Sequence, residues 1–71
     1  MIGKTIKTLR EEKGISQRKL AGQVGLANTT LSYIENGVVI PKAQTLIALA
    51  KALGVPPIKL IEEAYGEEVL E

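Results

Sequence analysis

The segment Gln17–Asn36, QRKLAGQVGLANTTLSYIEN, decides the fold of this chain. It holds two helix-length pieces, residues 17–24 and 28–36, joined by a turn too short for the helices to lie antiparallel, so they must cross steeply. A small residue is needed where they touch, which Ala21 provides, and the turn needs a positive φ, which Gly25 adopts without steric cost. Apolar side chains fall where this pair would pack on other helices: Leu20, Val24, Leu26, Leu31 and Ile34. The spacing predicts a helix-turn-helix.

Three further helices are predicted around this segment, because glycine and proline divide the rest of the chain into helix-length pieces. One precedes it, with apolar residues at helical spacing. Another is expected to open at Pro41 and to stop at Gly54, and a short one to run from Pro56-Pro57 to about Tyr65. Their predicted core positions are Ile2, Ile6, Leu9, the stem of Lys13, Leu46, Leu49, Ala50 and Leu53. The expected fold class is therefore a compact all-α five-helix bundle.

Charge is unevenly distributed along the chain, although the net charge is only +1. Residues 1–55 carry eight lysines and arginines against three glutamates, which leaves +5, and residues 56–71 carry one lysine against five glutamates, which leaves −4. We expect residues 1–65 to form one helix-turn-helix domain and residues 66–71 an acidic tail. A basic body favours a polyanionic partner, and ordinary solvated helix faces are the alternative explanation.

The composition argues against an enzyme. The 71 residues include no cysteine and no histidine, so disulfides, thiolate metal sites and the commonest acid–base catalyst are missing. We therefore expect no catalysis, no metal and no cofactor. The longest apolar stretch, residues 45–55, is interrupted by Lys51 and Gly54 and is too short to cross a bilayer. No secretion leader opens the chain, and a cytoplasmic, nucleoid-associated protein without membrane contact is the expectation.

Four segments of the chain resemble the Cro/cI phage-repressor (XRE-type) helix-turn-helix family. They are IKTLREEKGISQ (Ile6–Gln17), LAGQVGL (Leu20–Leu26), LSYIENG (Leu31–Gly37) and LAKALGV (Leu49–Val55), and the spacings between them are kept. The resemblance implies a bundle of the lambda-repressor-like DNA-binding type. It also implies a sequence-specific transcriptional regulator, a repressor, that inserts helix 28–36 into the major groove of double-stranded DNA.

The resemblance assigns base contacts to four residues of the third helix: Asn28, Thr29, Ser32 and Tyr33. Their chemistry agrees in kind, since Asn28 can pair with adenine through two hydrogen bonds and Thr29 can offer its methyl group to thymine. No arginine lies on this face to pair with guanine, so A·T base pairs should dominate the direct readout. A merely solvated helix face is the alternative for these polar residues.

Contacts to the DNA backbone are expected first from Gln17, where a side-chain amide and free backbone N–H groups face the same way. The other phosphate candidates are Arg10, Arg18, Lys19, Asn36 and Lys42. Arg10 and Glu35 also match positions that are paired in the family, so we expect an ion pair that joins the first and third helices.

The chain departs from the family pattern at three places. Ala27 and Lys42 stand where Ser or Thr commonly caps the third and fourth helices, which leaves first-turn N–H groups without a side-chain cap. The loop after Gly37 is often basic in the family but reads Val38-Val39-Ile40 here. These apolar residues could cover the core or contact another chain, and covering the core is the favoured reading.

Dimerisation is the usual route to specificity in the family, because two half-sites double the reading surface. The C-terminal end carries more apolar residues than a short helix needs, and these are predicted to form a homodimer interface: Ile58, Ile61, Tyr65, Val69 and Leu70. The alternative is that Ile58 and Ile61 close the core, which we expect of Ile61.

A second function of another class stays open. The same fold could serve as a protein-interaction module, such as an antitoxin or an adaptor, that binds a partner protein through Val38–Ile40 or the C-terminal tail. The basic body favours DNA, whereas the apolar loop favours the partner protein.

Overall fold

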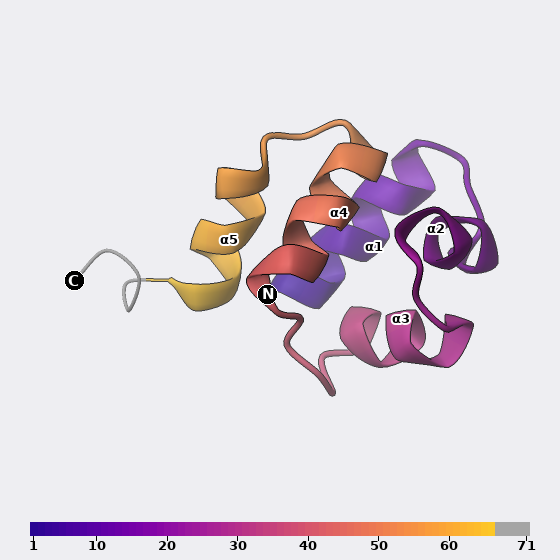
Figure 1. The fold of residues 1–71 in the computed structure, drawn as a ribbon, viewed down its shortest axis with the longest axis horizontal. Helices are drawn as coiled ribbons and strands as arrows, with labels where there is room; N and C mark the ends of the chain where they lie inside the picture. Colours follow the sequence, from indigo (N-terminus) through magenta and orange to yellow (C-terminus); the bar gives the residue numbers. More distant parts are fainter. Residues whose placement is uncertain (67–71) are drawn as a thin grey trace.

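The computed structural model describes residues 1–66, which form five helices (Figure 1). They are α1 (Ile2–Glu12), α2 (Gln17–Val24), α3 (Asn28–Glu35), α4 (Ala43–Leu53) and α5 (Pro57–Tyr65). No strand occurs within residues 1–66, and none of the helices described there is both long and apolar enough to span a bilayer. The predicted all-α five-helix architecture is confirmed.

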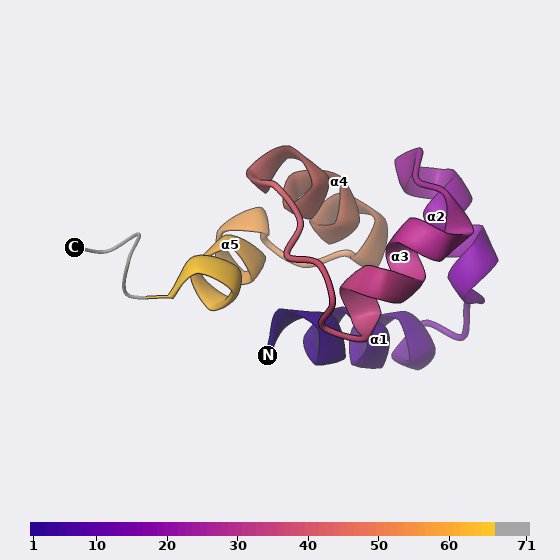
Figure 2. The same ribbon diagram turned by 90° about the horizontal axis from the view of Figure 1, so that it is seen from below.

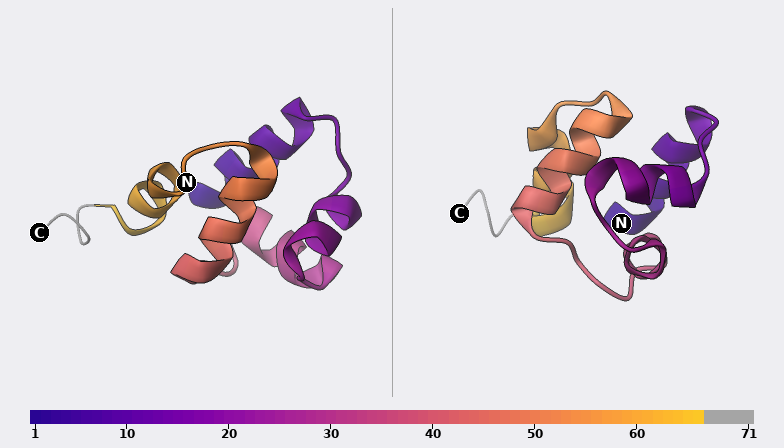
Figure 3. Two further views of the ribbon diagram at one scale, coloured as in Figure 1. Left: turned by 45° about the horizontal axis from the view of Figure 1, so that its top comes forward. Right: turned by 45° about the vertical axis from the view of Figure 1, so that its right-hand side comes forward.

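α1 and α4 lie at the centre of the molecule, with α5 at one end and the α2–α3 pair at the other (Figure 1). In the right-hand view of Figure 3, α3 is seen nearly end-on while α2 lies across the view, so the two helices cross steeply as predicted. α3 packs on α1 and on α2, and it lies toward the viewer when the molecule is seen from below (Figure 2). One long side of α3 is thereby left open to solvent.

All five helices share one apolar core. Its buried members are Ile2, Ile6, Leu20, Ala21, Leu31, Ile34, Leu46, Leu49, Ala50, Leu53 and Leu60. Leu9 and Val24, predicted as core residues, are partly buried against it, whereas Lys13 is exposed. Within α5 the core is closed by Leu60, which is 2% exposed, and not by the expected Ile61, which packs at its edge.

Local signals in the sequence set most helix ends. The Ser16 side chain caps α2 by accepting a hydrogen bond from the Lys19 N–H at 3.0 Å. Gly25 and Gly54 end α2 and α4 in the left-handed region, with φ of 72° and 75°. Pro57 is the first residue of α5, where its missing N–H costs no hydrogen bond.

The start of α4 differs from the expected position. Lys42, not Pro41, is the N-cap, and the helix begins at Ala43. Lys42 has an extended backbone, and its carbonyl accepts the first intrahelical bond from the Leu46 N–H at 3.0 Å. Pro41 is buried outside the helix, where its carbonyl accepts a hydrogen bond from the Tyr65 hydroxyl at 2.8 Å. This hydrogen bond ties the loop before α4 to α5.

Candidate nucleic-acid interface

The crossing of α2 and α3 depends on the two residues that the sequence predicted for it. Ala21 is buried in the core, and Gly25 turns the chain with a positive φ. The Leu26 N–H then donates to the Ala21 carbonyl at 2.9 Å, which closes the end of α2 and brings Leu26 against the core. The turn thus fixes the direction in which α3 leaves α2.

The four residues predicted to contact bases all lie on α3. Asn28, Thr29 and Tyr33 are exposed, Tyr33 by 53%, while Ser32 is half-buried. The opposite side of the helix buries Leu31 and Ile34. The structure therefore brings the predicted base-reading side chains together on α3, with the hydrophobic residues turned into the core. Their contacts with DNA remain a prediction.

The first turn of α3 has no side-chain cap, as the sequence predicted. Ala27 is the N-cap and makes no side-chain hydrogen bond to the helix. At the other end, Asn36 is the C-cap, one residue beyond the helix, and its amide donates to the Ser32 hydroxyl at 3.4 Å. Asn36 is exposed, so the amide stays accessible to a phosphate.

The predicted phosphate-binding residues of α2 surround its N-terminus. Arg18 and Lys19 are exposed, whereas Gln17 is half-buried. Because Ser16 caps only the Lys19 N–H, the N–H groups of Gln17 and Arg18 have no intrahelical acceptor. The positive end of the helix dipole and two cationic side chains therefore stand at one place, which suits a phosphate.

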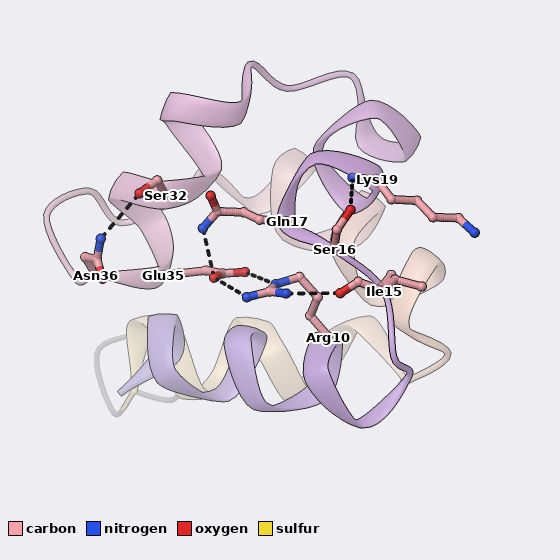
Figure 4. Close-up of polar contacts among 8 residues, drawn as sticks. All are labelled: Arg10, Ile15, Ser16, Gln17, Lys19, Ser32, Glu35 and Asn36. Carbon is pink, nitrogen blue, oxygen red and sulfur yellow. Dashed lines mark hydrogen bonds and ion pairs between the residues drawn. The ribbon is translucent and has the colours of Figure 1, made fainter.

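Arg10 lies in a different setting from the other candidates. Its guanidinium Nε donates to Glu35 Oε2 at 2.7 Å and its Nη2 to Glu35 Oε1 at 3.1 Å, while Nη1 donates to the Ile15 carbonyl at 3.0 Å (Figure 4). The predicted ion pair between α1 and α3 is confirmed. All three guanidinium nitrogens donate within the protein and the side chain is half-buried, while a phosphate contact by Arg10 stays a prediction.

The environment keeps this arginine charged. The hydrogen bond to Glu35, and after it the charges of Glu35 and Glu11, raise the pKa of Arg10 above its ordinary value, although burial acts in the opposite direction. Gln17 joins the pair, since its Nε2 donates to Glu35 Oε1 at 3.1 Å (Figure 4). Sequence reasoning missed this third contact, which joins residues 18 positions apart.

Lys42 comes close to α3 although it belongs to the start of α4. It borders a surface hollow that also takes in Thr30 of α3 and Ile40 of the preceding loop. Lys42 is exposed, so its ammonium group can reach beyond the hollow. The backbone-contact candidates other than Arg10 therefore border α3 from both the α2 side and the α4 side.

The apolar loop between α3 and α4 does not cover the core. Val38 and Ile40 are 69% and 63% exposed, and Val39 is exposed as well. The N–H groups of Val38 and Val39 both donate to the Tyr33 carbonyl, at 2.9 and 3.4 Å, which holds the loop on the outside of the last turn of α3. The expectation that these residues cover the core is wrong, and Pro41 is the buried residue of this loop.

The residues predicted for a dimer interface differ in exposure, and the interface itself stays a prediction. Ile58 is 55% exposed on α5, whereas Ile61 and Tyr65 are half-buried, and Tyr65 is tied to the Pro41 carbonyl. Val69 and Leu70 lie outside the described residues. Leu60, the core residue of α5 that was missed, shares a helical face with Pro57, Ile61 and Ala64, so spacing alone does not choose between Leu60 and Ile61.

Comparison with known proteins identifies this architecture. The sequence profile of the helix-turn-helix family matches residues 6–60. The chain belongs to the helix-turn-helix family. It is 33% identical over 64 residues to the cryptic phage CTXphi transcriptional repressor RstR of Vibrio cholerae, an alignment that covers 90% of this chain and 58% of RstR.

Solved structures of the same family have the same fold. SinR, the master regulator for biofilm formation, was solved in complex with DNA. It is 39% identical and superposes with a TM-score of 0.79, over 86% of this chain and 98% of that one. The P22 c2 repressor, solved with a synthetic operator, is 33% identical with a TM-score of 0.79, over 84% and 91% of the two chains. This helix-turn-helix protein is thus of the Cro/cI-like phage-repressor type, and its bundle is lambda-repressor-like.

Proposed function

We propose that this helix-turn-helix protein, a DNA-binding transcriptional regulator, acts as a repressor that reads an operator with the exposed side of α3. The observation that carries the proposal is the placement of Asn28, Thr29 and Tyr33 on one open helix whose other side is buried in the core. A helix of this exposure fits the major groove, and its amide, hydroxyl and methyl groups suit base edges.

Phosphate contacts on both sides of α3 would set its register in the groove. Gln17, Arg18 and Lys19 would bind one stretch of backbone through the N-terminus of α2, and Asn36 with Lys42 another. Arg10, held by Glu35 and the Ile15 carbonyl, would join α1 to α3 and remains a candidate for a phosphate contact. Such a protein works on the chromosome, in the cytoplasm and in association with the nucleoid.

We further propose that the protein binds as a homodimer through α5 and the residues after it. Ile58 supports this, since its large apolar side chain is left 55% exposed on α5. A two-fold dimer would place two copies of α3 about one DNA turn apart and would require a palindromic operator.

Selection of bound sequences from a random duplex pool tests the proposal. Enrichment of a palindrome with half-sites about 10 base pairs apart is expected. Affinity for that palindrome should fall with salt with a slope of about −0.9 for each phosphate neutralised. A pool that shows no enrichment, with weak and purely electrostatic binding, would contradict the proposal. Ile58→Asp should abolish the dimer in analytical ultracentrifugation while single half-sites remain bound.

A protein-interaction role is the second candidate, and one observation favours it. Val38, Val39 and Ile40 are three adjacent exposed apolar residues beside α3, and apolar surface patches often serve as contact sites. An adaptor or antitoxin would use this surface, or the C-terminal tail, to bind a partner protein. A Val38→Ser/Ile40→Ser variant that keeps full operator binding and loses repression in cells would support this role.

A further inference from the structure

We infer that Glu35 is a positioning residue for DNA binding, which orients the side-chain amide of Gln17 toward the sugar-phosphate backbone. This inference rests on the proposed function. Glu35 itself is out of reach of DNA, because its side chain lies on the buried side of α3 and is only 2% exposed. It would therefore act through Gln17 alone.

The Glu35 carboxylate is fixed by contacts that do not involve Gln17. Arg10 binds both carboxylate oxygens, at 2.7 and 3.1 Å, and the Ile15 carbonyl fixes Arg10 in turn. The ion pair neutralises the buried charge without help from Gln17. The bond from Gln17 at 3.1 Å is thus a third contact, which extends the fixed pair to the first residue of α2.

A carboxylate can only accept hydrogen bonds, so it determines which way the planar amide faces. Figure 4 shows the Gln17 nitrogen directed toward Glu35 and the Gln17 oxygen directed away from it. One amide hydrogen is used by Glu35, and the second stays available as a donor. This second amide hydrogen lies at the N-terminus of α2. The backbone N–H groups of Gln17 and Arg18 lie beside it and have no intrahelical acceptor, since Ser16 accepts only from the Lys19 N–H. Such a group of donors suits an anionic oxygen.

Fixing this amide in the free protein has a consequence for affinity. A glutamine side chain that is mobile in the free protein loses rotamer freedom when it binds a phosphate, whereas one already held by Glu35 loses little. Removing the Glu35 contact should therefore weaken operator binding about 3- to 10-fold, and only while Gln17 is present. A purely structural Glu35 would instead affect binding equally with and without Gln17.

A double-mutant cycle on the selected operator tests the inference. Glu35→Gln and Gln17→Ala are made singly and together, and Kd is measured by fluorescence anisotropy at fixed salt. The charge added by Glu35→Gln is the same in both Gln17 backgrounds and cancels in the cycle. We expect Glu35→Gln to show only this charge effect in the Gln17→Ala chain, and to bind about 3- to 10-fold more weakly than the charge effect alone would give when Gln17 is present. The inference would be overturned if Glu35→Gln changed Kd by the same factor in both backgrounds. It would also be overturned if Glu35→Gln tightened binding more in the Gln17 chain than in the Gln17→Ala chain.

Because Glu35→Gln could unfold the domain, a second pair of variants repeats the cycle. Arg10→Met/Glu35→Leu replaces the ion pair with apolar side chains and leaves the net charge unchanged, a replacement that buried pairs often tolerate. It should lose the same factor as Glu35→Gln, again only when Gln17 is present. If it binds the operator as tightly as the parent, positioning by Glu35 is excluded.

NMR of the Gln17 side-chain amide needs no substitution. One amide proton should be shifted and slow to exchange in the free protein, and the other should shift when the operator is added. Loss of the first signal's shift on DNA binding would mean that the bond to Glu35 breaks, which overturns the inference. If the parent chain binds no duplex at all, the proposed function fails first. A parent that binds DNA with an additive cycle contradicts the positioning role alone.

Discussion

Gly3 of α1 lies directly against the backbone of Ile34 at the end of α3. A Cβ atom on Gly3 would collide with the Ile34 carbonyl oxygen and would stand 2.9 Å from the carbonyl oxygen of Glu35. The absence of a side chain therefore lets α1 approach α3 closely enough for Arg10, two turns further along α1, to reach Glu35. The close approach and the ion pair are two parts of one helix contact.

Gly3→Ala should destabilise the protein because the new methyl group has no space. We expect a loss of about 1–3 kcal/mol in the free energy of unfolding, measured by urea denaturation. Gly22 provides a matched control, since it also lies inside a helix but a Cβ atom added to it would meet nothing within 4 Å beyond its own helix. Gly22→Ala should stabilise the protein by about 0.5–1 kcal/mol. A Gly3→Ala protein as stable as Gly22→Ala would contradict the close approach.

Arg10→Met should be among the most damaging single substitutions in the chain. It leaves the Glu35 carboxylate buried without its cation, which costs about 3–5 kcal/mol, close to the whole stability of so small a domain. Arg10→Met/Glu35→Leu should recover most of that loss in the same urea measurement. If the single and double variants unfold at the same urea concentration, the loss in Arg10→Met does not come from leaving Glu35 without its cation.

The ion pair should also persist at alkaline pH. Hydrogen bonding to Glu35 raises the pKa of Arg10 in the folded protein. A cation with a raised pKa stabilises the fold at every pH below its unfolded value and loses this effect only as pH rises through the folded value. Since arginine is charged throughout the accessible range, circular dichroism should show no loss of helix through Arg10 between neutral pH and pH about 10.

Substitutions in α3 and in α2 should affect DNA binding differently, because α3 is proposed to contact bases and α2 phosphates. Tyr33→Ala and Asn28→Ala should each cost about 1–3 kcal/mol on the selected operator and change binding to random duplex little. Arg18→Ala should weaken binding to both duplexes and lower the salt slope by about one phosphate. All three side chains are exposed, so melting temperatures serve as the control for folding. Equal losses on both duplexes for Tyr33→Ala would remove it from the base-reading set.

The parts of this fold that follow from local rules could be predicted from the sequence. The turn at Gly25 and the start of α5 at Pro57 depend on residues within one helical turn, and each is found as expected. The buried sides of α3 and α4 followed from helical spacing over several turns. The ion pair of Arg10 with Glu35 required the family resemblance, because its partners lie 25 positions apart.

What the sequence could not provide depends on how helices meet in space. α5 has nine residues, and its rotation against α4 decides that Leu60 and not Ile61 is buried. The same holds for Gly3, whose importance appears only when α1 lies against α3. The third contact of Glu35, from Gln17, likewise depends on the crossing of α2 and α3. The composition of Val38–Ile40, three adjacent apolar residues, suggested a position over the core. The hydrogen bonds from this loop to the Tyr33 carbonyl hold it on the outside of α3 instead.

The exposure of the Val38–Ile40 loop predicts that its side chains contribute little to stability. Val38→Ser/Ile40→Ser should change the free energy of unfolding by no more than about 0.5 kcal/mol for each residue, because both side chains are already in water. Leu60→Ala, in a residue that is 2% exposed, should cost about 2–5 kcal/mol through lost burial and the cavity it leaves. Both are measured by urea denaturation under one condition. A serine variant that loses as much as Leu60→Ala would mean that the loop covers apolar surface in solution, either in its own molecule or in a second copy. Dilution over a hundredfold range would then distinguish these two, since only stability gained from a second copy depends on protein concentration.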